Sequence, residues 1–146
     1  MPAFHVSLDA FVTMSNRRDM RSDEERAKAY KLHCENLRST LSRIAQTDFD
    51  IILDLVLRDE AELQACLKAL SGRPTYLVGL TAPLSVLEAR GRERPDRASG
   101  IAKEQVADPV YNRQYDLMLD TSMTSPEAGA AAVRKLINAR SRLTPA

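Results

Sequence analysis

The chain has 146 residues, of which 44% are hydrophobic and 28% are charged, and its formal net charge is +1. This composition is ordinary for a globular protein, and so small a net charge gives no field that would attract nucleic acid or an anionic membrane. No apolar run approaches the roughly 20 residues of a membrane span, and no basic and apolar leader suggests export. We therefore expect a single domain over residues 1–146, located in the cytoplasm, with no nucleic-acid or membrane partner.

Short apolar runs alternate with amphipathic segments along the whole chain. In the first half of the chain, the pattern predicts a strand at 4–8, a helix at 23–45, a strand at 51–57 and a helix at 60–70. In the second half, it predicts a strand at 75–80, a helix opened by Pro83, a short helix at 101–108, a strand at 115–119 and a last helix that begins at Ser125-Pro126. Strands that alternate with helices predict an α/β fold with a mostly parallel sheet.

The helix at 23–45 has the clearest periodicity. Its apolar residues recur at steps of three and four, and Ser22 or Asp23 is the expected N-cap. Cys34 lies on this apolar stripe and Cys66 on that of the next helix, so we expect two small buried thiols rather than a disulfide or zinc site. His5 and His33 show no metal-ligand spacing, and we interpret them as structural or surface residues.

Two aspartates follow apolar residues of predicted strands, toward the carboxyl ends where open α/β sheets bind their ligands. Asp9 follows the first strand; its carboxylate could accept a proton from a substrate hydroxyl, or it could simply cap a short helix. Asp54 ends the apolar residues 51–53 and is the one acid in the run 51–57, as an acid that orients magnesium would be, and a buried aspartate is uncommon unless it has a partner.

An arginine-rich segment, Arg90–Gly100, interrupts the chain between two predicted helices. Guanidinium groups suit phosphate oxygens, so the segment has the character of a flap over a phosphate. The alternative is a solvated helix end whose arginines pair with Glu88 and Glu93.

The order and spacing of several motifs resemble those of the chloramphenicol phosphotransferase family, over about Phe4 to Ile137. The lid motif of that family is similar to Arg94–Ala102 with Gln105. The other matching pieces are Val6–Phe11 with Met14, Ile51–Leu57, Tyr115-Asp116 and Asp120-Thr121-Ser122. The family's histidine a few residues before Tyr115 is replaced by Val110, so its contribution is not carried over.

The resemblance implies a three-layer fold like that of P-loop kinases, an ATP and Mg²⁺ requirement, and a lid at about 90–108. It implies that Asp9 is the catalytic base, while Asp54 binds magnesium. It also implies that Arg94 and Arg97 clamp the phosphoryl group or ATP, and that Thr121 and Ser122 lie beside the nucleotide. The residues that it places beside the substrate are Phe11, Met14 and Leu57. Turn capping is the alternative for Thr121 and Ser122, and core packing is the alternative for the apolar residues.

The chain contains no Gly-x-x-x-x-Gly-Lys-Ser/Thr loop, which cradles phosphates in such kinases. The resemblance places this loop on a βα unit before the segment that begins at Phe4, in the middle of the sheet. By analogy, the strands 4–8 and 51–57 would lie on one side of it and the strands 75–80 and 115–119 on the other. We expect that the natural product starts upstream of Met1, or that the chain is a degenerate relative whose open strand edges a homo-oligomer could cover.

The leading hypothesis is an ATP-dependent phosphotransferase that acts on a hydroxyl of a small molecule. The family's name implies that an antibiotic is inactivated by phosphorylation of a primary hydroxyl. The alternatives are a non-catalytic binding protein that lacks the nucleotide site, and a kinase of another small molecule.

Overall fold

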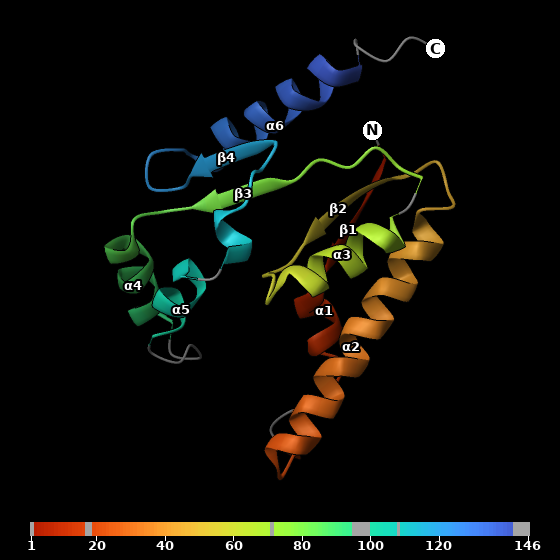
Figure 1. Cartoon of the computed structure of the whole chain (residues 1–146), viewed down its shortest axis with the longest axis vertical. Coiled ribbons are helices and arrows are strands. Elements are labelled where there is room, and N and C mark those ends of the chain that lie inside the picture. Colours follow the sequence, from red (N-terminus) through yellow and green to blue (C-terminus); the bar gives the residue numbers. More distant parts are fainter. Residues whose placement is uncertain (1, 17–18, 71, 95–99, 108, 142–146) are drawn as a thin grey trace. The chain divides into compact units, whose positions relative to one another are not determined.

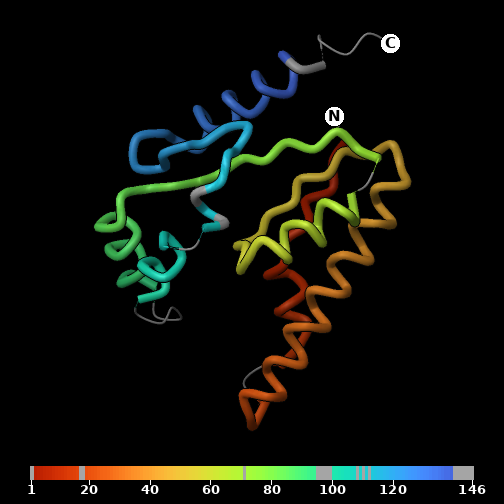
Figure 2. The backbone as a smooth tube through the Cα atoms, in the orientation of Figure 1, coloured from red at the N-terminus to blue at the C-terminus, as the bar shows by residue number. Residues whose placement is uncertain are grey.

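The computed structural model describes residues 2–16, 19–70, 72–94, 100–107 and 109–141. The chain divides into two compact units, residues 1–75 and residues 76–146, which we call unit 1 and unit 2. Figures 1 and 2 show the path of the chain, and each unit contains a pair of strands with helices around it. The expectation of a single domain over both units stays a prediction.

Unit 1 is built on a parallel strand pair. Its elements are β1 (Ala3–Ser7), α1 (Leu8–Val12), α2 (Asp23–Ile44), β2 (Asp50–Asp54) and α3 (Glu60–Ala69). β1 pairs with β2 so that Phe4 lies opposite Ile51 and Ser7 lies opposite Asp54. A parallel pair needs a long crossover, and the segment with α1 and α2 supplies it (Figure 1).

Unit 2 repeats this parallel pairing. Its elements are β3 (Val78–Thr81), α4 (Leu84–Arg92), α5 (Ile101–Ala107), a 3₁₀ turn (Pro109–Asn112), β4 (Leu117–Asp120) and α6 (Pro126–Ser141). Val78 lies opposite Leu117, and Thr81 lies opposite Asp120. The α/β class with parallel strands is therefore confirmed, and the strands pair two by two as the resemblance implied.

Several predicted strand bounds were wrong. The strand at 51–57 ends already at Asp54, β3 begins at Val78 instead of Thr75, and β4 begins at Leu117 instead of Tyr115. In the first case the cause is the partner strand. β1 ends at Ser7, opposite Asp54, because the chain turns into α1 at Leu8. The apolar residues 55–57 therefore have no residues of β1 opposite them to pair with.

The core of unit 1 lies between one face of its sheet and the helices. Val6 on β1 and Ile51 and Leu53 on β2 pack with the buried stripe of α2 and with α3. Leu41 is fully buried, and both Cys34 and Cys66 are buried free thiols, as predicted. In the described part of the chain, no helix is long and apolar enough to cross a membrane.

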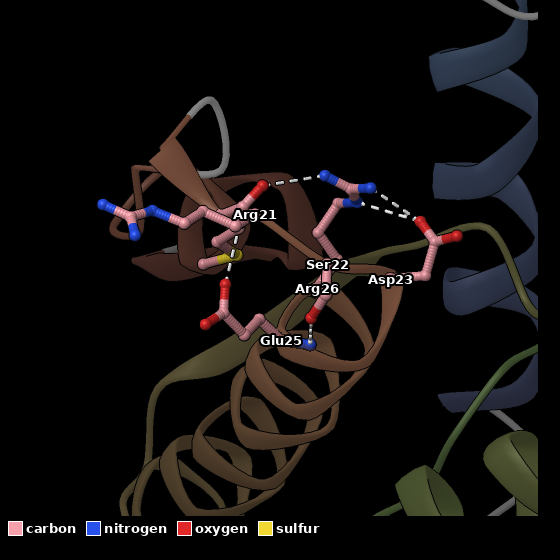
Figure 3. A network of polar contacts seen from close by, with 6 residues as sticks. Arg21, Ser22, Asp23, Glu25 and Arg26 are labelled. Atoms are coloured by element: carbon pink, nitrogen blue, oxygen red, sulfur yellow. Dashed lines mark hydrogen bonds and ion pairs between the residues drawn. The ribbon is translucent and has the colours of Figure 1, made fainter.

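The start of α2 is fixed by a reciprocal cap, drawn in Figure 3. Ser22 is the N-cap, and its Oγ accepts a hydrogen bond from the Glu25 N–H at 3.1 Å. The Glu25 carboxylate in turn accepts from the Arg21 N–H at 2.8 Å, while Arg26 binds Asp23 at 2.7 Å. The Ser22 bond satisfies a backbone donor that the first helical turn leaves unpaired, and the Glu25 bond satisfies the N–H of the residue before the cap. Of the two predicted caps, Ser22 is therefore the one that the structure contains.

We predict that Leu41→Ala lowers the free energy of unfolding by about 2–5 kcal/mol, because it removes a fully buried side chain and leaves a cavity. Leu32→Ala on the same helix removes a side chain that is 54% exposed, and we expect a loss of no more than about 0.5 kcal/mol. Urea unfolding followed by circular dichroism measures both. Equal losses would contradict the packing of α2 against the sheet.

Candidate functional site

A pocket of about 250 Å³ opens where β1 and β2 end. It is lined by Ser7, Leu8, Asp9, Val12, Tyr30, Asp54, Leu55, Val56 and Arg58. The register explains the meeting of its acids, since Ser7 lies opposite Asp54 and Asp9 follows two residues later. A second hollow, on the surface of α6, is lined by no acidic side chain. The pocket of unit 1 is therefore the candidate site.

Asp9 lies in the first turn of α1. Its placement directly at the strand end was wrong, because β1 stops at Ser7, and the capping alternative was wrong too, because Ser7 is the N-cap. No hydrogen bond or ion pair reaches the Asp9 carboxylate from the described residues, and the side chain is exposed in the pocket. An acid with free oxygens can accept a proton from a bound hydroxyl.

Asp54 is the last residue of β2, and its side chain is 70% exposed. The interpretation as a buried acid was therefore wrong. Its Oδ2 lies 3.8 Å from Nε2 of His5 on the neighbouring strand, a contact that the spacing of the histidines did not suggest. The described residues contain no cluster of three or more potential metal ligands. Magnesium needs only one or two carboxylates when substrate phosphates and water complete its shell, so Asp54 fits that ion.

Tyr30 and Arg58 are pocket residues that sequence reasoning missed. The Arg58 guanidinium carbon lies 4.6 Å from the centre of the Tyr30 ring, a cation–π contact between α2 and the segment before α3. Burial, together with the nearby Glu62 carboxylate, raises the pKa of Tyr30 to about 12. Tyr30 had the helical spacing of a core residue, and Arg58 carried only the weak signal of a cation four residues after Asp54.

None of the three apolar residues assigned to the substrate lines the pocket. Phe11 packs against the core of unit 1, Met14 is 73% exposed, and Leu57 is half-buried. Their substrate contact stays a prediction. Leu8, Val12, Leu55 and Val56, which are their neighbours in sequence, form the apolar wall instead.

In unit 2, Thr121 is held from two sides. Its backbone N–H and its hydroxyl both donate to the Thr81 carbonyl, at 2.8 and 3.0 Å. Arg90 on α4 donates to the Thr121 hydroxyl and to its carbonyl, both at 2.9 Å. Arg90 is thus more than a solvated arginine, because it fixes the loop after β4 to α4.

Ser122 forms a tight turn with Asp120. Its backbone N–H and its hydroxyl donate to Asp120 Oδ1 at 2.8 and 2.6 Å. These two bonds, with a smaller effect of Arg90, hold the pKa of Asp120 below its usual range. The turn-forming alternative for Thr121 and Ser122 therefore describes what these residues do in the structure, and their contact with a nucleotide stays a prediction.

The lid is described in part. Arg94 is exposed just after α4, and its N–H donates to the Gly91 carbonyl at 3.1 Å. Arg97 lies outside the described residues. The structure thus brings Asp9 and Asp54 together in unit 1, and Arg90, Thr121 and Ser122 together in unit 2.

We predict that Ser122→Ala raises the pKa of Asp120, because it removes the hydroxyl donor and leaves the backbone donor in place. A carboxyl NMR titration measures the shift. Glu127 is the internal control: its pKa is lowered by its own backbone and by Ser125, so it should not move. An unchanged pKa of Asp120 would show that the bond from the Ser122 hydroxyl does not stabilise the charged carboxylate.

Of the comparisons with known proteins, a family model gave a match. The search of curated proteins gave no match. The family model described as chloramphenicol phosphotransferase-like protein matches residues 1–138, and this range includes the pocket of unit 1 and the loop after β4. The chain therefore belongs to the chloramphenicol phosphotransferase-like family, which indicates a kinase-type phosphotransferase.

Proposed function

We propose that the protein is an ATP-dependent phosphotransferase that transfers the γ-phosphate to a hydroxyl of a small molecule. The observation that carries the proposal is the pocket at the ends of β1 and β2. Its lining holds an exposed Asp54 and an Asp9 whose carboxylate has no hydrogen-bond or ion-pair partner among the described residues. Family membership supports the reaction class. A pocket of about 250 Å³ suits a small molecule or one end of a larger one.

Asp9 is the proposed base. A hydroxyl that binds in the pocket can donate a hydrogen bond to its carboxylate, which then takes the proton as the oxygen attacks phosphorus. The first turn of α1 holds the carboxylate, and Leu8, buried beside it, anchors that turn in the core.

Asp54 is the proposed magnesium ligand. The ion, when bound, would neutralise charge on the phosphates and bridge them. An exposed carboxylate at the end of a strand fits this requirement, because the phosphates and water can supply the other ligands.

The proposed nucleotide contacts lie in unit 2. Arg94 and Arg97 would bind phosphate oxygens, and Thr121 and Ser122 would lie beside the nucleoside on the loop that Arg90 fixes. None of the 146 residues forms a Gly-x-x-x-x-Gly-Lys-Ser/Thr loop, so this chain offers no such cradle for the triphosphate. The three-layer arrangement of P-loop kinases is part of the proposal.

The missing loop motif also favours a second candidate, a non-catalytic protein that binds the acceptor molecule alone. Chloramphenicol is the first acceptor to test, since the family is described by it. Its phosphorylation would mean antibiotic inactivation, and a location in the cytoplasm is part of the proposal. Transfer to other hydroxyl compounds, but not to chloramphenicol, would indicate a kinase of another substrate.

We predict that Asp9→Asn lowers kcat for transfer from Mg-ATP to chloramphenicol by about 100-fold or more, because the amide cannot accept the proton. Calorimetry should show that the dissociation constant of the acceptor changes by less than about threefold, since the amide keeps the shape of the carboxylate. Product is measured by mass spectrometry.

Asp48→Asn, at an exposed position outside the pocket, is the matched control and should leave turnover unchanged. Full activity of Asp9→Asn would rule out Asp9 as the base. Acceptor binding by the unaltered protein without any transfer or Mg-ATP binding would overturn the proposed reaction and support the binding protein.

A further inference from the structure

We propose that Arg58, held over the ring of Tyr30, is a specificity-determining residue that binds an uncharged carbonyl-type oxygen of the acceptor molecule. The inference rests on the proposed function in one respect, namely that the pocket of unit 1 receives the acceptor. It adds a second point of recognition to the hydroxyl that Asp9 would bind.

The side chain of Arg58 is held by an aromatic ring. Its guanidinium carbon lies 4.6 Å from the centre of the Tyr30 ring, within the range of a cation–π contact. The Tyr30 hydroxyl is engaged with the Cys34 thiol one turn further along α2, and its pKa of about 12 keeps it uncharged near neutral pH. The ring is therefore the part of Tyr30 that positions Arg58.

The backbone of Arg58 is held independently by α3. Its N–H donates to Glu62 Oε2 at 2.7 Å, and the Glu62 N–H donates to the N-cap Asp59 at 2.8 Å. The other Glu62 oxygen accepts a longer bond, of 3.7 Å, from the Cys34 thiol on α2. Contacts with both helices thus fix Arg58 before any ligand binds, which reduces the entropy lost on binding.

The guanidinium of Arg58 keeps donors for a ligand. It carries five N–H donors, and the contact with the Tyr30 ring, 4.6 Å from the guanidinium carbon to the ring centre, does not use them as hydrogen bonds. Among the residues that the structure describes, the Arg58 side chain has no ion pair, and the carboxylates of Asp54, Asp23 and Asp50 pair with other residues, namely His5, Arg26 and Arg73. A pocket residue with unused donors is suited to an oxygen acceptor.

The charges of the lining select against an anion. Asp9 and Asp54 place two carboxylates in the pocket, opposed by the single guanidinium of Arg58. A carboxylate or phosphate on the acceptor would gain the Arg58 bond but would be repelled by both acids. An amide, ketone or similar neutral oxygen gains the bond without that repulsion.

The test is a binding titration without nucleotide, followed by NMR of the whole chain. The probes are p-hydroxymethylbenzamide, its carboxylate analogue p-hydroxymethylbenzoate, and p-methylbenzyl alcohol, which share one hydroxyl. We expect the benzamide to bind at least about fivefold more tightly than the alcohol, because a charge-assisted hydrogen bond is lost with the carbonyl. The benzoate should bind more weakly than the benzamide.

Arg58→Met keeps the unbranched chain and should abolish the preference for the benzamide over the alcohol. Tyr30→Phe keeps the ring and should retain the preference, whereas Tyr30→Leu should reduce it. Arg43→Met, an exposed arginine of α2 outside the pocket, is the matched control. Thermal melting confirms that each variant is folded.

A benzamide preference that survives Arg58→Met, a benzoate that binds most tightly, or no binding of any probe would overturn the proposal. Because no ATP is present, these outcomes are separate from the proposed reaction. If the protein prefers the benzamide through Arg58 but transfers no phosphate, the phosphotransferase activity is rejected and the role of Arg58 stands. If Arg58→Met transfers phosphate with the acceptor KM of the unaltered protein, the role of Arg58 is rejected and the phosphotransferase activity stands.

Discussion

The register of β1 against β2 is the constraint on which the candidate site depends. Because Ser7 lies opposite Asp54, the two strands end at the same level and both following segments enter one pocket. A shift of one residue in this register would also turn Val6 away from the core, where it packs with α2. The burial of that face therefore secures the position of the acids as well as the fold of unit 1.

In both units, a helix holds the segment that follows a strand. In unit 1, α2 and α3 together hold Arg58, through the Tyr30 ring and the Glu62 carboxylate. In unit 2, α4 holds Thr121 through the two bonds from Arg90. Segments at the carboxyl ends of parallel strands are where α/β proteins bind ligands. The chain belongs to the chloramphenicol phosphotransferase-like family, and we propose that these held segments contact the ligands of a phosphotransferase.

Local patterns predicted much of the fold. Apolar periodicity found α2, the alternation of strands and helices found the α/β class, and the two cysteines were buried as their positions indicated. These features depend on residues close together in sequence. The family resemblance contributed the grouping of the strands into two sets and brought Asp9 forward as a candidate base, which spacing alone did not decide.

The remaining features depend on contacts between distant residues. The end of β2 is set by the end of β1, which is why the apolar residues after Asp54 were misread as strand. The exposure of Asp54 could not be predicted from an apolar run whose residues are half-buried or exposed in the folded strand. The Arg58 contact with Tyr30 and the Arg90 contact with Thr121 each join segments far apart in the chain, so neither leaves a local pattern.

The central claim is that a small hydroxyl compound binds between the acids and Arg58 in unit 1. The most direct measurement is a titration of the isotope-labelled chain with chloramphenicol, followed by amide and tyrosine NMR shifts. The account predicts saturable shifts confined to residues 7–12 and 54–58 and to Tyr30, the segments that line the pocket. Shifts centred on α6, or no saturable shift at those segments, would contradict it.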